Sequence, residues 1–452
     1  RIPTLIRLPK ETDMTTLSRT KRRTQVNAGA GGPTGSRRAW AITLLLLGFM
    51  LVNFGDRAVL GLAAAPLMKE TGISPSQYGL ISSGFYLLFS VSAIVVGFIA
   101  NRVSNKVLIL IMAIVWSLAQ LPILFVANVG VLLASRVALG AAEGPSAPVA
   151  MNAVQKWFPD HKRNAPTALL NSGSALGVVI LAPVLGLVIG QFGWRAAFGV
   201  MCALGVLWAA LWAVFGREGT ADRTPGPATI GETETGGLRV PYRRIFLTGT
   251  ALSVAFSGLA LSFGLATLVS WIPVYLAGPL GFDAGTAALL IILPWLASAL
   301  LMSTQGAVSD ALMSRGVPSR VARGVLGACG MLAAAACLVG VVAAPSLPFK
   351  IVCITLAFSV SGMQFTIGTT MMAELAPPRQ RAAVLSIVAA VTALAGLVSP
   401  AITGVLVQAH GVASPTGFHQ SFLLNAALLG AAGLVALLLA RPARDAARIA
   451  AR

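Results

Sequence analysis

Four ionisable side chains lie inside long apolar stretches of the sequence: Asp56 and Arg57 in the first stretch, and Arg136 and Glu143 in the fourth. Ionisable groups within a membrane are costly, and they usually mark a substrate or proton pathway. Arg136 and Glu143 are seven residues apart, which on a helix places them within about 20° of one face and about 10 Å apart along the axis. The adjacent Asp56 and Arg57 diverge by about 100°, so one can face a substrate path while the other faces a neighbouring helix.

This combination of groups suits the handling of protons and anions. Burial favours the protonated form of a carboxylate, whereas a nearby arginine favours the charged form. An arginine that moves between conformations would therefore let the carboxylate bind and release a proton near neutral pH. The alternative is a structural ion-pair network that only holds two helices together. Because buried ion pairs are weak evidence for stability, we favour the functional interpretation.

The overall composition is that of a chain embedded in a lipid bilayer. Of its 452 residues, 56% are hydrophobic and only 10% are charged, and the mean hydropathy is +0.83. A soluble chain of this length needs far more charge to cover its surface. The formal net charge of +19 invites a nucleic-acid interpretation, but the basic residues are spread over the ends and short connections and form no single face. We expect the lipid bilayer as a partner and no nucleic acid.

Long apolar stretches predict an all-α membrane protein of twelve transmembrane helices, because a helix needs about 20 apolar residues to cross the hydrocarbon core. One long polar connection, rich in Gly, Pro, Thr and Glu, reads as a flexible linker that divides the stretches six and six. The predicted parts are a basic N-terminal tail at 1–38, a six-helix half at 39–215, the linker at 216–244, a second six-helix half at 245–440 and a basic C-terminal tail at 441–452. The stretches are 39–65, 79–100, 107–127, 129–153, 165–190, 195–215, 245–276, 285–309, 321–344, 348–373, 382–408 and 418–440.

The distribution of basic residues predicts the orientation. With both termini in the cytoplasm, 28 of the 33 Lys and Arg fall on the cytoplasmic side, 3 fall on the opposite side and 2 fall inside the stretches. An excess of Lys and Arg marks cytoplasmic loops. We therefore expect a multi-pass protein of the cell's inner (plasma) membrane with both termini cytoplasmic.

Two short connections resemble each other. The one after the second stretch reads Gly97-Phe-Ile-Ala-Asn101-Arg102, and the one after the eighth reads Gly306-Ala-Val-Ser-Asp310. Equivalent loops in equivalent positions indicate two pseudo-repeats of six helices. We expect Asn101, Arg102 and Asp310 to belong to gating loops.

Motifs are spread over nearly the whole chain. The most specific are Asn53-Phe-Gly-Asp56-Arg57 in the first stretch and Arg136-Val-Ala-Leu-Gly-Ala-Ala-Glu143 in the fourth. Others are Trp157-Phe-Pro159, Arg163, Asn171-Ser-Gly173, Gly177, Trp271-Ile-Pro273-Val-Tyr275-Leu276 and Leu375-Ala-Pro377. With these residues the chain resembles the major facilitator superfamily and, more closely, its anion:cation symporter branch, which includes sugar-acid/proton symporters and vesicular anion carriers.

The resemblance implies a role for each ionisable residue in the stretches. Arg57 is expected to contact the carboxylate of the substrate. Asp56 and Glu143 are expected to form the protonatable pair, and Arg136 to be their charge partner and part of the gating network. The two halves would rock around a site near the midplane.

The chain departs from the pattern of the sugar-acid carriers in this branch. Phe54 and Phe89 stand where such carriers often have Tyr, and Val388-Ala-Ala390 stands where an Asn is expected. A site for polyols needs polar partners, because each unpaired hydroxyl costs about 1–3 kcal/mol. We expect Phe54 and Phe89 to line a drier site, for a carboxylate that is aromatic or lightly hydroxylated. In addition, Asn101 replaces the usual loop Asp, so an electrostatic latch there is expected to be weakened.

The second half offers polar but uncharged candidates for substrate binding. Gln364, Thr366 and Thr369 lie in the tenth stretch, and we expect them to contact the substrate together with Arg57. Trp271 and Tyr275, near the end of the seventh stretch, suit anchoring at the membrane interface at least as well as binding.

No enzyme, cofactor or metal site is expected from the sequence. His161, His410 and His419 have no metal-ligand spacing, and we find no nucleophile–base constellation or phosphate-binding loop. An ion gradient is therefore the expected energy source. The expected partners are a small organic anion and protons, and we expect a monomer.

Three functional hypotheses remain. The leading one is proton-coupled symport, in the uptake direction, of a small organic anion by alternating access. The second is a multidrug/proton antiporter of the same fold, although two membrane-embedded arginines suit anions better and the fifth stretch reads Leu181-Ala-Pro183 without a Gly-Pro pair. The third, a non-transporting sensor, would need a soluble signalling domain, and the sequence indicates none.

Overall fold

The computed structural model describes residues 37–100, 102–159, 162–219, 240–377 and 380–450. Every regular element in these ranges is helical, as the sequence predicts. Ten of the described helices are long and apolar enough to cross a membrane, which makes the chain a multi-pass membrane protein. Most of the predicted N-terminal tail and linker lies outside the described residues.

The two other predicted stretches are also helical. Residues 129–153 form α4 (Val129–Glu143) and α5 (Ser146–Gln155). The helix is interrupted beside Pro145, whose nitrogen carries no hydrogen to donate to the preceding turn. The stretch at 348–373 lies within α13 (Leu347–Leu375).

Most of the remaining helices follow the predicted stretches with shifted ends, whereas the helix at 242–246 begins in the predicted linker and the one at 442–450 lies in the predicted C-terminal tail. They are α1 (Arg37–Thr71), α2 (Pro75–Ile99), α3 (Asn105–Gln120), α6 (Asn164–Phe192), α7 (Trp194–Phe215), α8 (Tyr242–Phe246), α9 (Gly249–Ser270), α10 (Ile272–Ala277), α11 (Ala284–Ser314), α12 (Leu326–Ala343), α14 (Arg381–His410), α15 (Thr416–Leu439) and α16 (Pro442–Ala450), with a 3-10 turn at Leu121–Leu124 and a π-helical turn at Arg320–Val325.

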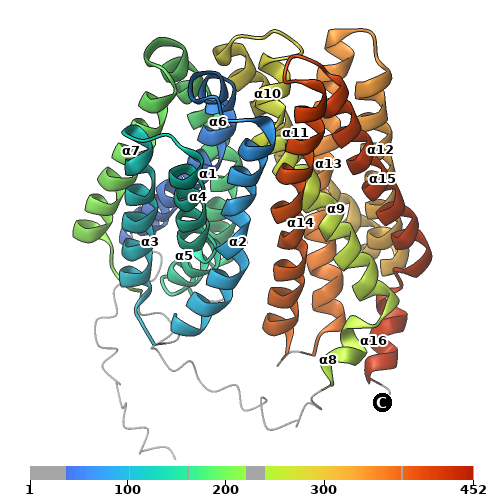
Figure 1. Cartoon of the computed structure of the whole chain (residues 1–452). Coiled ribbons are helices and arrows are strands. Elements are labelled where there is room, and N and C mark those ends of the chain that lie inside the picture. The colour runs from blue at the N-terminus through green and yellow to red at the C-terminus, as the bar shows by residue number, and fades with distance from the viewer. Residues whose placement is uncertain (1–36, 101, 160–161, 220–239, 378–379, 451–452) are drawn as a thin grey trace, which may run out of the picture.

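The helices stand in two groups (Figure 1). Helices α1–α7, coloured blue to green, lie on one side, and α9–α15, coloured yellow to red, lie on the other. Two helix pairs join the groups: α2 packs against α14, and α6 packs against α11. In addition, α1 contacts α9 and α10. The boundary between the groups is therefore lined by helices from both parts of the chain.

Glycines allow α2 and α14 to meet backbone to backbone. A Cβ added to Gly79 would lie 2.4 Å from the carbonyl oxygen of Pro400, and one added to Gly404 would lie 2.6 Å from that of Pro75. Such small residues permit close helix approach in membranes. The backbone nitrogen of Ser76 also donates to Gln408 Oε1 at 3.1 Å. This crossing lies at the end of the molecule where residues 72–74 connect α1 to α2, and we call it the α2–α14 crossing.

The region treated above as a basic C-terminal tail contains a docked helix, α16. Asp445 of α16 is buried, and its Oδ2 accepts hydrogen bonds from the nitrogen of Thr250 at 3.0 Å and from its hydroxyl at 2.7 Å. Thr250 lies in the first turn of α9, where backbone N–H groups lack partners within the helix. One acidic residue in a basic segment therefore caps a membrane helix.

Candidate functional site

The pair Arg57–Glu143 joins α1 to α4. Arg57 Nε donates to Glu143 Oε2 at 2.9 Å, and the Glu143 side chain is fully buried whereas that of Arg57 is 21% exposed. Arg57 also donates to Asn53 Oδ1, one helical turn earlier, at 3.2 Å. These two bonds use two of the five N–H donors of a guanidinium. The partly exposed arginine therefore keeps donor capacity for a further acceptor.

Three phenylalanines surround the Arg57 guanidinium. Its central carbon lies 4.6 Å from the ring centre of Phe54, 5.2 Å from that of Phe85 and 5.1 Å from that of Phe89. A cation over an aromatic face is stabilised, more so where water is excluded. The rings can thus hold the positive charge in an apolar setting while its N–H edge stays available.

The spacing of Gly140 in α4 and Gly144 at its C-terminal cap brings the α2 phenylalanines to this position. A Cβ on Gly140 would lie 1.8 Å from the carbonyl oxygen of Phe85, and a Cβ on Gly144 would lie 2.1 Å from that of Phe89. Small residues four apart let two membrane helices approach closely. The sequence Gly140-Ala-Ala-Glu-Gly144 thus places α2 against α4 and presents Glu143 beside the same rings.

Asp56 and Arg136 form a second buried group behind Arg57. Asp56 is fully buried and accepts a hydrogen bond from Gln120 Nε2 at 2.7 Å. Arg136 donates to the backbone oxygen of Asp56 at 3.4 Å, and its guanidinium lies 5.5 Å from the ring centre of Phe198. Asp56 and Arg57 do point to different partners, as their adjacency predicts. Gln120 was not anticipated, because a lone amide near the end of an apolar stretch gives no distinguishing signal.

Several atoms of this group have no hydrogen-bond partner among the described residues. They include Asp56 Oδ2, Glu143 Oε1, and Nε and one terminal nitrogen of Arg136. Buried polar atoms are nearly always paired, so unpaired ones in a cluster need an explanation. The cluster therefore has unused capacity to bind a proton, a water molecule or an anion.

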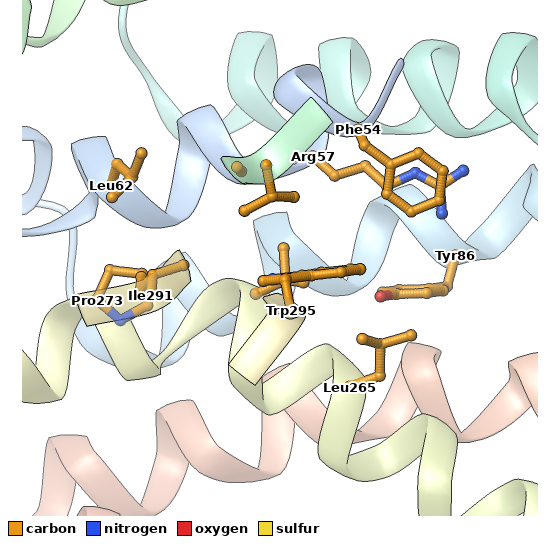
Figure 2. A pocket seen from close by; sticks show the side chains of 11 residues that line it. Phe54, Arg57, Leu62, Tyr86, Leu265, Pro273, Ile291 and Trp295 are labelled. Atoms are coloured by element: carbon orange, nitrogen blue, oxygen red, sulfur yellow. The ribbon is translucent and has the colours of Figure 1, made fainter. Parts of the chain in front are cut away.

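A cavity opens beside Arg57 (Figure 2), and the empty space within it, including the part open to solvent, is about 450 Å³. Its walls come from α1, α2 and α6 on one side and from α9, α10 and α11 on the other, so it lies between the two groups of helices. We call it the apolar cavity, and it is lined by Phe54, Arg57, Ala58, Leu62, Tyr86, Val178, Leu265, Val269, Pro273, Ile291 and Trp295.

A second cavity of about 350 Å³ shares Arg57, Tyr86 and Val269 with the first. It also reaches Arg136 and the hydroxyl-bearing residue Ser82, and we call it the polar cavity. The two spaces therefore meet at Arg57. Such a concave site with a few polar groups on an apolar wall is typical of small-molecule binding sites.

The second-half candidates from the sequence lie away from both cavities. Gln364 is buried against α12, where a Cβ on Gly327 would lie 2.0 Å from Gln364 Oε1. Thr366 and Thr369 are exposed on α13. None of the three lines either cavity, so contact with the substrate in another conformation stays a prediction. The wall contributed by the second half contains Trp295 and Leu265 instead.

The other predicted residues fall in different places. Arg102 and Asp310 are exposed, and Asn101 lies outside the described residues. Trp271 and Tyr275 are fully buried, which contradicts anchoring at the membrane interface, one of the two roles that the sequence left open. Both pack against Phe418, and Trp271 also meets the Tyr78 ring of α2 across the boundary between the two groups.

Comparisons with known proteins agree with this architecture. Residues 45–358 and 319–452 match the model of the Major Facilitator Superfamily. The chain is 26% identical over 397 residues to the hexuronate transporter of Bacillus subtilis (strain 168), covering 87% of this chain and 92% of that protein. It is 26% identical over 420 residues to the D-galactonate transporter of Escherichia coli O6:H1, covering 89% and 96%.

The fold is also that of a solved transporter. The crystal structure of a bacterial homolog to the human lysosomal transporter Spinster, in an inward-facing and unoccupied conformation, superposes with a TM-score of 0.75. The identity is 20%, and the match covers 91% of this chain and 98% of that one. At this identity the likeness concerns the fold.

Proposed function

This chain belongs to the Major Facilitator Superfamily, and we propose that it is a secondary active transporter that takes up a small organic anion together with protons. In this proposal twelve helices form two six-helix halves, at 39–215 and 245–440. The halves rock around the cavity beside Arg57 in alternating access. The protein would lie in the inner (plasma) membrane with both termini in the cytoplasm.

The observation that carries this proposal is the Arg57–Glu143 ion pair on the wall of a cavity between the two groups of helices. The cavity-facing partner is the cation, and the carboxylate behind it is fully buried. An organic anion that enters the cavity meets Arg57 first. The names of the hexuronate and D-galactonate transporters support an organic anion as the substrate.

The same pair provides a route to proton coupling. When the carboxylate of the substrate binds Arg57 in place of Glu143, Glu143 loses its ion-pair partner. An unpaired buried charge is strongly unfavourable. A proton on Glu143 removes that charge. One anion and one proton then enter together, and the net charge of the site does not change. Asp56, with its unpaired Oδ2, is the second candidate for protonation.

The α2–α14 crossing supports alternating access. It joins the two groups at the end where residues 72–74 connect α1 to α2. In the predicted orientation that end faces outward, so the contacts belong to an inward-facing state. Transport would require this crossing to open.

Uptake into proteoliposomes tests the proposal. With an alkaline interior, the purified protein should accumulate at least one labelled anion from a panel of D-glucuronate, D-galactonate and phenylacetate, after subtraction of uptake into empty liposomes. Asp56→Asn and Glu143→Gln should abolish accumulation driven by the pH gradient while sparing exchange of labelled for unlabelled substrate.

Glu218→Gln is the matched control, because Glu218 pairs with Lys156 at 2.6 Å away from both cavities. It should accumulate substrate like the wild type. If Asp56→Asn and Glu143→Gln also do so, proton coupling through this cluster is wrong. If the wild type accumulates no anion, the transport proposal is wrong.

The largely apolar cavity is the one observation that favours the alternative, a multidrug/proton antiporter. Arg57 on its wall opposes this, because a cationic drug would be repelled. Expression in a drug-sensitive strain separates the two proposals. Resistance to lipophilic cations without uptake of any carboxylate would favour the antiporter.

A further inference from the structure

We propose that the substrate is a monocarboxylate that carries an aromatic ring, and that Trp295 of α11 selects the ring. This inference rests on the proposed function and narrows it to one class of anion. Its basis is the division of the site into an apolar and a polar cavity that meet at Arg57.

The shared wall fixes the orientation of the substrate. Arg57 and Tyr86 line both cavities, so a carboxylate at their junction can bind the guanidinium and the tyrosine hydroxyl together. Arginine binds carboxylates through two parallel N–H bonds. The body of the anion then extends into the apolar cavity, between the two groups of helices.

The apolar cavity has few groups that could satisfy hydroxyls. In the part of the chain that the structure describes, its polar side-chain groups are the Arg57 guanidinium, the Tyr86 hydroxyl and the Trp295 indole N–H. Of these, only the hydroxyl can accept a hydrogen bond. A sugar acid brings several hydroxyls into this space. Each one left unpaired weakens binding by about tenfold.

The far wall of the apolar cavity excludes a second charge. It includes Leu62, Pro273 and Ile291, and among the described residues no charged residue other than Arg57 lines this cavity. A second carboxylate there would be desolvated without a partner, which is strongly unfavourable. A monocarboxylate with an apolar body fits both ends of the site.

Trp295 provides the aromatic contact from the second group of helices. Its ring centre lies 5.9 Å from that of Phe54 at an interplanar angle of 80°. Phe54 already covers the Arg57 guanidinium at 4.6 Å, whereas Figure 2 shows Trp295 facing the space beside Arg57 and Tyr86. An aromatic ring placed here gains edge-to-face contacts beyond its area burial.

Binding to the purified full-length protein, measured by isothermal titration calorimetry, tests the inference. The probes are phenylacetate, hexanoate and D-glucuronate. We expect phenylacetate to bind at least about tenfold more tightly than D-glucuronate. We also expect it to bind more tightly than hexanoate, which has an apolar body without a ring.

Each other outcome decides a separate point. If D-glucuronate binds as tightly as phenylacetate, the inference is overturned, whereas accumulation of D-glucuronate in proteoliposomes would leave the proposed function intact. If hexanoate binds as tightly as phenylacetate, selection of a ring is overturned. If no probe binds and none is accumulated, the proposed function itself fails.

Variants locate the selection at one residue. Trp295→Leu should weaken phenylacetate binding about fivefold or more and hexanoate binding less, and Trp295→Phe should restore most of the loss. Trp40→Leu is the matched control, because Trp40 is 38% exposed and contacts Phe158 away from the cavities. If a monodisperse Trp295→Leu protein binds phenylacetate with the affinity of the wild type, the role of Trp295 is overturned. If that variant does not fold, the comparison of the three probes on the wild-type protein still tests whether the site selects a ring.

Discussion

The Tyr78 hydroxyl of α2 donates to the backbone oxygen of Ser270 at the end of α9, at 2.9 Å. The Tyr78 ring meets that of Trp271 edge to face at 5.0 Å, and Trp271 Nε1 donates to the Pro400 oxygen of α14 at 3.0 Å. Tyr78 and Trp271 are fully buried. The two groups of helices can therefore separate here only by breaking the buried hydrogen bond from Tyr78 to Ser270 and the ring contact between Tyr78 and Trp271.

Tyr78→Phe should shift the conformational equilibrium toward the state that is open at this end. The variant keeps the ring but removes the hydrogen bond to Ser270, which contributes about 0.5–1.5 kcal/mol. Val269→Cys, in a background with the four native cysteines replaced by Ala, places a thiol on the wall of both cavities. We expect a membrane-impermeant maleimide, added at the side of the α2–α14 crossing, to label this cysteine about two- to tenfold faster in Tyr78→Phe than in the protein that keeps Tyr78.

Tyr275→Phe is the matched control for this experiment. The Tyr275 hydroxyl pairs with His419 Nε2 at 3.1 Å within the second group of helices, so its loss should not change labelling. Equal labelling rates in all three proteins would show that the Tyr78 hydrogen bond does not hold the crossing closed.

Gly79→Ala should prevent the α2–α14 crossing from closing fully. The added methyl would lie 2.4 Å from the Pro400 oxygen, too close for any contact without backbone movement. We expect transport to fall about tenfold or more, because a forced shift of packed helices costs about 1–3 kcal/mol. Initial rates in proteoliposomes, normalised to reconstituted protein, measure the effect.

Gly97→Ala on the same helix provides the comparison. Its added methyl would meet nothing within 4 Å, and alanine is the better helix former. This variant should transport like the wild type. Normal transport by Gly79→Ala would contradict the role assigned to the close approach.

The sequence singled out four charged residues that the structure brings together, and it did so for a physical reason. Asp56, Arg57, Arg136 and Glu143 stand out because ionisable residues in apolar stretches are rare. Helical periodicity also predicted that Asp56 and Arg57 diverge. It could not show that Arg57 rather than Arg136 pairs with Glu143. The spacing of residues shows which of them share a face of one helix, but it does not show which helices pack together.

The apolar part of the site was not predictable in the same way. A sequence-based search for substrate contacts in the second half selects polar residues such as Gln364, and the structure buries that amide against α12. The second-half residues that do line the apolar cavity, such as Trp295 and Leu265, are largely apolar. In a membrane protein apolar side chains face lipid, core and cavity alike, so composition does not separate them. Similarly, α16 was hidden in a basic segment, because its one buried acidic residue, Asp445, gives no signal of docking in the sequence.

Arg57→Lys should weaken anion binding although it keeps the charge. Lysine is a compact point charge that lacks the planar fork for a carboxylate and the flat face that contacts aromatic rings. The Phe54, Phe85 and Phe89 contacts with the guanidinium would therefore be lost. We expect carboxylate affinity to fall about tenfold or more in calorimetry.

Arg448→Lys is the control for this substitution, since Arg448 is exposed on α16. It should bind the carboxylate with wild-type affinity. An unchanged affinity in Arg57→Lys would mean that the site recognises only a positive charge, and the aromatic surround would then need another explanation.

Asp445→Ala should destabilise the second group of helices without altering transport by the folded protein. The substitution leaves the Thr250 nitrogen and hydroxyl without the acceptor they now share. Loss of a helix cap costs about 0.5–2 kcal/mol, so the melting temperature of the purified protein should fall. Arg448→Ala, an exposed position of α16, should leave the melting temperature unchanged.

If both variants melt like the wild type, Asp445 does not stabilise α9. If Asp445→Ala folds normally but transports slowly, α16 acts on the transport cycle rather than on stability.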